Sequence, residues 1–363
     1  MIQVLQARKS LSGNPDMLVI GAGVFGLWAA RHAIKAGRTV LVVDKRHAGA
    51  GASGGFLGAL MPHMPDRWNA KKQHQFDALV GLEPAVRALE ADTGMDCGYR
   101  RCGRLIPVTS ESTRAIVEAR IAGAKIHWPG FAMSMLEPPF TGTIGQGWLA
   151  AKAAPYGGQW DDLSARIDPR ALVAALAAFV RTYGELREGV EVVALEPRRA
   201  MLADGSHIDA GQVVVANGWE AYALLQRQMG ALTGGALIGR GVKGQAVLLG
   251  LAHGDERPIV YHDGAYVVPQ AGNRVSIGSS TVEDWQGDPG WFDPGDVAFQ
   301  EKALALVPAL VHAPVIERWA GVRPRNMLIP KDTEAYFGPV PGLEGVSARI
   351  GGFKTGLAVA WEG

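Results

Sequence analysis

The residues best suited to chemistry near the start of the chain are Gly21, Gly23, Gly26 and Asp44. The glycines follow an apolar run typical of a buried strand. Their spacing suits a tight turn, a close approach of the backbone to a pyrophosphate, and close packing of the helix that follows. Asp44 ends the next apolar run, where a carboxylate can accept hydrogen bonds from a ribose. The pattern predicts a dinucleotide site, and the motif alone leaves both NAD and FAD open.

The elements that must position these residues form one βαβ unit. We expect a helix over residues 24–36, because Gly37 ends the apolar periodicity. Unpaired amides and the positive end of the dipole at its N-terminus favour a phosphate there. Lys45 and Arg46 follow Asp44 and leave a 2′-phosphate open, although two basic residues after a strand are more often a solvated turn.

Length and charge indicate a two-domain protein that acts on small molecules. The chain has 363 residues, and 36 Lys and Arg nearly balance 35 Asp and Glu, which argues against a nucleic-acid surface. Cys97 and Cys102 have no further Cys or clustered His near them in the sequence, so we expect reduced thiols and no metal site. Residues 1–16 lack the apolar core of a signal peptide, and no run is long enough to span a bilayer. We therefore expect a cytoplasmic protein without stable membrane insertion.

Hydrophobic periodicity predicts an α/β fold with a second, interleaved domain. Continuous β-branched runs indicate a parallel sheet covered on both faces, whereas alternation over residues 243–280 indicates an antiparallel, half-exposed sheet. Helices are expected at 68–93, 169–183 and 294–307, and strands at 103–108, near Trp148, and at 190–195, 213–216 and 346–350. The predicted Rossmann-like nucleotide domain comprises residues 1–80, 150–225 and 325–363, and the predicted α+β substrate domain comprises 81–149 and 226–324.

Five sequence blocks, in order, carry a resemblance over nearly the whole chain. They are VIGAGVFG with Asp44, GASGGFLGALMPH, VVVANGWEA, YVVPQ with RVSIGSST, and WAGVRPRN leading to GGFKTG. This ordered set resembles the glycine oxidase and D-amino-acid oxidase family of flavoenzymes. The resemblance implies FAD rather than NAD. It also implies noncovalent FAD, because no cysteine lies between Arg323 and Gly351, where sarcosine-oxidase relatives attach their flavin.

The resemblance assigns most cofactor contacts to small residues. Gly21, Gly23 and Gly26 would hold the pyrophosphate, Asp44 the adenosine ribose, Ala52 and Ser53 the phosphates and ribityl chain, Gly58 and Ala59 the isoalloxazine, and the Val192 backbone the adenine. Ala216, Asn217 and Gly218 would lie beside the cofactor, where Asn217 departs from the small residue usual in the family. Further contacts are expected from Val24, Phe25, Lys45, Gly352, Phe353, Lys354, Thr355 and Gly356.

Three residues are expected on the substrate side. Arg323 matches the arginine that binds the substrate carboxylate, for which a planar guanidinium is well suited. Tyr266 matches a tyrosine whose hydroxyl assists. Lys354 stands where glycine oxidases commonly have arginine, so a cation is kept and bidentate geometry is lost. The structural alternatives are a surface arginine before proline and a core tyrosine.

The resemblance implies oxidation of the amine of a small amino acid of the glycine, sarcosine or D-amino-acid type. A hydride would pass to flavin N5, leaving an imine, and reoxidation by O2 would give hydrogen peroxide. The alternatives are a dehydrogenase that reduces a quinone or carrier, an oxidase of a glycine-like nucleoside in tRNA, a non-catalytic flavin-binding protein, and an NAD-dependent dehydrogenase. Only LAVAWEG follows GGFKTG, where the family has a longer helix, so a shortened chain is left open. The sequence leaves the particular amine and the oligomeric state open too.

Overall fold

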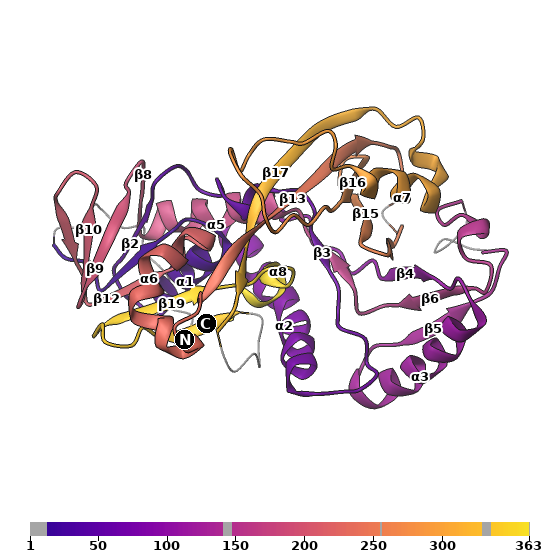
Figure 1. Cartoon of the computed structure of the whole chain (residues 1–363), viewed down its shortest axis with the longest axis horizontal. Helices are drawn as coiled ribbons and strands as arrows, with labels where there is room; N and C mark the ends of the chain where they lie inside the picture. Colours follow the sequence, from indigo (N-terminus) through magenta and orange to yellow (C-terminus); the bar gives the residue numbers. More distant parts are fainter. Residues whose placement is uncertain (1–12, 141–146, 255, 329–334, 363) are drawn as a thin grey trace.

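The computed structural model describes residues 13–140, 147–254, 256–328 and 335–362, and contains two large sheets. Figure 1 shows a six-stranded sheet with its helices at one end of the molecule and an eight-stranded sheet at the other. The α/β class is confirmed. Most of the N-terminal stretch expected not to be a signal peptide, residues 1–12, lies outside the described residues.

The six-stranded sheet is built around the strand that precedes the glycine turn. Its order is β18-β19-β12-β1-β2-β8, and β1 pairs in parallel with β12 on one side and β2 on the other. The buried runs of β1, β2 and β12 explain the central positions, because only a sheet covered on both faces buries every residue of a strand. The strands are β1 (Met17–Ile20), β2 (Val40–Asp44), β8 (Glu185–Glu188), β12 (Gln212–Val215), β18 (Tyr336–Pro339) and β19 (Val346–Ile350).

Different layers cover the two faces of this sheet. On one face, α1 (Val24–Lys35) packs on α5 (Pro169–Tyr183), and α2 (Ala70–Thr93) packs on α5 and on α8 (Gly356–Val359). On the other face lie α6 (Ala221–Met229) and a small sheet of β9 (Val192–Glu196), β10 (Arg199–Leu202) and β11 (His207–Asp209). The resulting three-layer arrangement leaves the carboxyl ends of β1, β2 and β12 open to a ligand.

Local signals fix the ends of the long helices. The Asp168 carboxylate accepts hydrogen bonds from the backbone N–H groups of Arg170 and Ala171 and so caps α5, with Pro169 at its first position. Asn69 caps α2 in the same way. Gly94 ends α2 in a left-handed conformation with φ of 69°. The helices expected at 24–36, 68–93 and 169–183 are confirmed to within a few residues.

The eight-stranded sheet forms the core of the other end of the molecule. Its order is β17-β13-β16-β15-β14-β4-β6-β5, with all pairs antiparallel except β14 with β4. The outer face packs on α7, and α3 packs on β5. The elements are β4 (Arg104–Pro107), α3 (Glu111–His127), β5 (Met133–Leu136), β6 (Gly158–Asp161), β13 (Gly239–Gly250), β14 (Ile259–His262), β15 (Ala265–Gln270), β16 (Arg274–Gly278), α7 (Ala298–Leu306) and β17 (Val315–Asn326).

Several expected elements differ from the structure. No strand includes Trp148. Its ring is buried in the core beneath the eight-stranded sheet and its Nε1 donates to the Pro258 carbonyl at 2.8 Å, so packing rather than strand pairing explains the apolar signal. The helix expected from residue 294 begins at Ala298, because a turn over 293–296 is held by Asp293. The strand expected at 190–195 is present as β9, which begins two residues later and belongs to the small sheet. β6 pairs within the eight-stranded sheet, and the predicted two-domain division stays a proposal.

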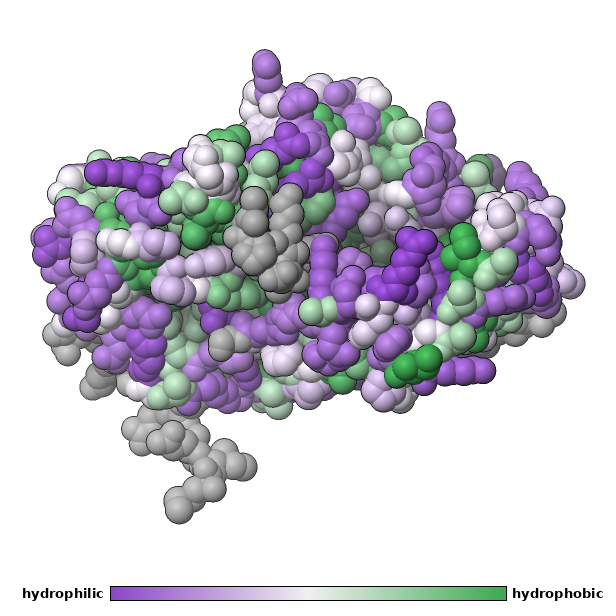
Figure 2. Space-filling model, turned by 60° about the horizontal axis from the view of Figure 1, so that its bottom comes forward, coloured by the Kyte–Doolittle hydropathy of each residue, from purple (hydrophilic) through white to green (hydrophobic). Residues whose placement is uncertain are grey.

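The described surface is mostly polar on the face drawn in Figure 2, where hydrophobic residues are scattered among hydrophilic ones. Within the described residues, no helix combines the length and apolarity that crossing a bilayer requires.

Candidate active site

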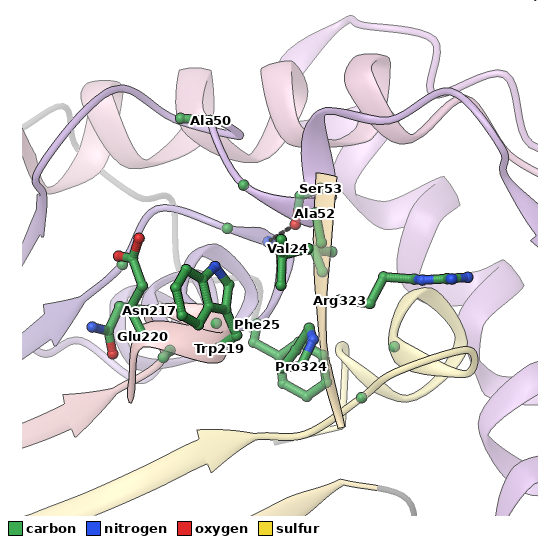
Figure 3. Close-up of a pocket in the computed structure, with 18 of the residues that line it drawn as sticks. Val24, Phe25, Ala50, Ala52, Ser53, Asn217, Trp219, Glu220, Arg323 and Pro324 are labelled. Carbon is green, nitrogen blue, oxygen red and sulfur yellow. Dashed lines mark hydrogen bonds between the residues drawn. The ribbon is translucent and has the colours of Figure 1, made fainter. Parts of the chain in front are cut away.

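A cavity of about 470 Å³ runs from the carboxyl ends of β1, β2 and β12 to the inner face of β13 and β17. Crevices at the carboxyl ends of parallel strands, where the strand order reverses, are the usual ligand sites of such sheets. Figure 3 shows Asn217 and Glu220 on one side of this pocket, Val24 and Ser53 near its middle, and Arg323 on the opposite side. The cavity is therefore elongated, with chemically different ends.

The glycine turn between β1 and α1 forms one wall. Gly21 has φ of 106°, and a Cβ there would lie 2.6 Å from the Ala216 carbonyl oxygen, so only glycine fits this turn. A Cβ on Gly23 would meet only the Ser53 hydroxyl, at 3.3 Å, so this stretch of backbone stays open to a ligand. Gly26 lies outside the cavity lining, and a Cβ there would lie 1.9 Å from the Gly21 carbonyl oxygen, so this glycine permits the close packing of helix on strand.

Polar groups around this turn are aimed at the cavity. The Val24 N–H, at the start of α1, donates to the Ser53 hydroxyl at 3.0 Å. The Asp44 carboxylate accepts from the N–H groups of Ala22 and Arg46, each at 2.8 Å, and still has lone pairs for further donors. The side-chain oxygen of Asn217 is buried without a hydrogen-bond partner. The set offers both donors and acceptors to a nucleotide.

Arg323 dominates the opposite end. It lies on β17, and its Nη2 donates to the Ser280 carbonyl at 2.7 Å while its Nε is buried without a partner. No acidic side chain among the described residues forms an ion pair with it, and burial lowers the pKa of its guanidinium. A half-buried positive charge whose hydrogen-bond partners among the described residues are neutral oxygens attracts an anion. The guanidinium extends over Gly244 on β13, where a Cβ would lie 2.5 Å from Nη2.

Tyr266 and Phe353 complete this end. Tyr266, on β15, stacks at a tilt on Tyr261 with 4.8 Å between ring centroids, and burial raises the pKa of Tyr266 to about 12. Its hydroxyl is therefore a protonated donor at neutral pH. Phe353 has a left-handed φ of 35°, and its ring lies 4.2 Å from the Arg325 guanidinium, 5.3 Å from that of Arg323 and 5.8 Å from the Lys354 ammonium.

The cavity brings together most of the residues expected from the sequence. Arg323, Tyr266 and Lys354 line it, as do Gly21, Gly23, Val24, Phe25, Asp44, Lys45, Ala52, Ser53, Ala59, Val192, Ala216, Asn217, Gly218, Gly352, Phe353 and Gly356.

Three expected cofactor residues, Gly26 among them, lie outside this lining. A Cβ on Gly58 would lie 1.8 Å from the Ile167 carbonyl oxygen, so glycine there lets two chain segments cross. The Thr355 N–H donates to the Gly352 carbonyl at 2.8 Å and supports the turn before α8. Both residues shape the cavity wall from behind.

Several lining residues were not expected. Trp219 and Glu220 follow directly after the expected Asn217 and Gly218, so their position in that block was an available signal. Gly244, Gln245, Ser279 and Trp319 also line the cavity. Ser279 and Trp319 lie within the blocks RVSIGSST and WAGVRPRN, so a signal was available for them too. Gly244 and Gln245 reach the cavity through strand register, such as the pairing of Gly244 with Gly321, which a single sequence does not reveal.

Comparisons with known proteins show the family and the fold. The family model described as FAD dependent oxidoreductase matches residues 16–362. A glycine oxidase of Pseudomonas aeruginosa is 27% identical over 352 residues, which cover 95% of this chain and 91% of that protein. The bifunctional protein ThiO/ThiG of Synechocystis is 26% identical over 376 residues, and this chain spans only about half of it. The crystal structure of glycine oxidase from Geobacillus kaustophilus matches with a TM-score of 0.81 and 23% identity, covering 96% of this chain and 92% of that chain, which shows the shared fold.

Proposed function

The chain belongs to the family of FAD-dependent oxidoreductases, and from this premise we propose that it oxidises the amine of a small amino acid of the glycine, sarcosine or D-amino-acid type. The observation that carries the proposal is Arg323, a half-buried guanidinium whose Nε is buried without a hydrogen-bond partner and which has no acidic partner among the described residues, at the end of the cavity away from the glycine turn. Relatives named glycine oxidase, at 27% identity over 95% of the chain, support the same substrate class.

The residues at the nucleotide end fit FAD. The turn at Gly21 and the open backbone at Gly23 form a cradle that a larger residue would fill, and Asp44 offers acceptors to a ribose. The Ser53 hydroxyl, which accepts from the Val24 amide, would donate its own hydrogen to the pyrophosphate, since the N-terminus of α1 favours negative charge. When bound, FAD supplies the two-electron acceptor, so the amine would leave as an imine that water hydrolyses, and reoxidation by O2 would give hydrogen peroxide.

The residues at the other end would bind and orient the amino acid. Arg323 would hold the carboxylate through parallel charge-assisted hydrogen bonds, and Tyr266 would donate from its neutral hydroxyl. Lys354 would add positive charge at the rim. Among the residues that the structure describes, no carboxylate lines the cavity near Arg323, so the carboxylate of an amino acid is attracted there and not repelled.

The test is anaerobic bleaching of the flavin absorbance by a panel of glycine, sarcosine, proline and D-amino acids, followed by measurement of peroxide under air. Arg323→Lys keeps the charge and loses the planar pair of donors, so we expect KM for the best substrate to rise about 10- to 100-fold. Arg318→Lys, at an exposed position on the same strand, is the matched control and should keep the wild-type KM. Failure of the whole panel to bleach the flavin would contradict the proposed substrate class, and an unchanged KM in Arg323→Lys would remove that residue from the role.

A further inference from the structure

The nucleotide end of the cavity contains an ion pair that the resemblance to oxidases did not anticipate. The Glu220 carboxylate lies 3.0 Å from the Lys45 ammonium and 3.9 Å from the Arg46 guanidinium. All three residues line the cavity, together with Asn217 and Trp219. The ion pair is therefore part of the cavity wall.

The ion pair crosses the carboxyl end of β1, as the positions of its residues next to the six-stranded sheet show. Lys45 directly follows β2, and Glu220 ends the short turn Gly218–Glu220 after β12. β2 and β12 flank β1, so the two side chains meet across the carboxyl end of β1, above the glycine turn. Neighbouring strands are about 4.8 Å apart, so the pair spans a gap of about 10 Å between β2 and β12. A nucleotide that lies along this turn would therefore lie next to the pair.

The pair bounds the cavity without filling it. The cavity of about 470 Å³ exists with the ion pair formed, and Glu220 is one of its lining residues. The Glu220 side chain is 22% exposed and that of Lys45 36%, so the pair is partly shielded from water. Figure 3 shows Glu220 beside Asn217, on the side opposite Arg323. A dinucleotide that reaches from this side toward Arg323 would have its adenosine half beside the pair.

We propose that Glu220 and Lys45 form a clasp that closes over the adenosine half of FAD and slows its release. This inference depends on FAD as the cofactor and not on which amine is oxidised. Glu220 is thus a positioning residue for the cofactor, acting through the basic side chains that follow Asp44. Because the clasp is electrostatic and partly exposed, salt should weaken it.

The test is the rate of FAD release from purified holoenzyme, followed as the rise of free flavin fluorescence after dilution into flavin-free buffer. Glu220→Gln keeps the shape and the polar atoms but removes the charge. We expect this variant to release FAD about fivefold faster than wild type at low salt. Release from wild type should accelerate between about 0.05 and 0.5 M NaCl, while release from Glu220→Gln should change little.

The matched control is Glu344→Gln, which removes one charge from an ion pair with Arg198 outside this cavity. It should release FAD at the wild-type rate with the wild-type salt dependence. Far-UV circular dichroism of each holoenzyme verifies folding before dilution. Release from Glu220→Gln at the wild-type rate would overturn the clasp, as would faster release that keeps the wild-type salt dependence or equally faster release from Glu344→Gln. No substrate is present, so failure to oxidise the amino acid panel leaves this measurement unaffected.

Discussion

The Arg323 guanidinium can lie across β13 only because residue 244 is glycine. A Cβ on Gly244 would lie 2.5 Å from Nη2 and 2.7 Å from Cζ of Arg323, so any other residue must displace the guanidinium. Gly244 pairs with Gly321 on β17, and this pair of small residues leaves the inner face of the sheet flat beside the cation. The position of the Arg323 guanidinium therefore depends on the absence of a side chain at residue 244.

We expect Gly244→Ala to raise KM for the amino acid about tenfold or more, because a shifted guanidinium no longer meets the carboxylate in line. FAD content should stay at the wild-type level. Gly250→Ala on the same strand is the control, since a Cβ there would make ordinary contact with Pro314 at 3.4 Å. Steady-state kinetics and the flavin-to-protein absorbance ratio measure both effects, and a wild-type KM in Gly244→Ala would contradict this account.

Individual site residues were predictable from sequence where their signal is local. The turn at Gly21 and Gly23 and the acid Asp44 have fixed spacing along the chain, and all three line the cavity. Gly244 and Gln245 reach the same cavity through pairing with a strand more than seventy residues away in the sequence, and no local pattern marks them. The role of Glu220 could not be predicted either, because its ion pair with Lys45 joins residues that are far apart in the sequence.

At the scale of elements, a buried ion pair joins two strands of the eight-stranded sheet. Arg104 on β4 and Asp161 on β6 lie directly opposite each other, with Nε and Nη2 each 2.8 Å from the Asp161 carboxylate. Their side chains are 3% and 1% exposed. Asp161 also accepts from the Ser164 N–H, and Arg104 donates to the Pro62 carbonyl. These bonds tie the sheet to the segment that follows β3 (Ala59–Leu60).

Asp161→Asn should lower the free energy of unfolding by about 3–5 kcal/mol, because it leaves a buried guanidinium without its counter-charge. Urea unfolding followed by circular dichroism measures the change. Glu137→Gln breaks the exposed ion pair with Arg114 and should leave the unfolding midpoint nearly unchanged. Equal midpoints for Asp161→Asn and wild type would show that this pair does not hold β4 and β6 together.

Elements were predicted best where apolar periodicity and end signals coincide. α5 has an acidic cap, a first-turn proline and an unbroken apolar face, and its limits match the expectation. α3 was not expected, since it is largely polar and buries only Val117 and Ala124. The position of such a surface helix is set by its packing on β5, and the sequence shows no apolar stripe that would predict it. The mistaken strand near Trp148 has the opposite cause, an apolar cluster without regular structure.

For the whole molecule, the burial of titratable groups makes the folded state less stable at high pH. Burial raises the pKa of Tyr266 from 10.0 to about 12, of Cys97 from 9.0 to about 12, and of Cys102 from 9.0 to about 11. The folded state therefore keeps protons that the unfolded chain releases. The stability linked to these groups is fully present below their unfolded pKa values and is lost as pH rises toward the folded values.

We expect the melting temperature to fall steadily from about pH 9 to about pH 11 as these groups ionise in the unfolded chain. Thermal unfolding followed by circular dichroism measures it. Native protein at pH 8 should also react slowly with a thiol reagent, because both cysteines are buried and protonated. A melting temperature that stays constant up to pH 11 would contradict this assignment.

The parallel sheet has a consequence for biosynthesis. β1 and β2 leave the ribosome early, but β1 can pair on its other side only when β12, which begins at Gln212, has emerged. β12 in turn can pair on its other side only when β19, which begins at Val346, has emerged. During translation the glycine turn is complete long before β12, one of the two strands beside β1, exists. The complete cavity can therefore form only after most of the polypeptide has been made, and until then the apolar residues of β1 and β2 lack part of the layer that covers them.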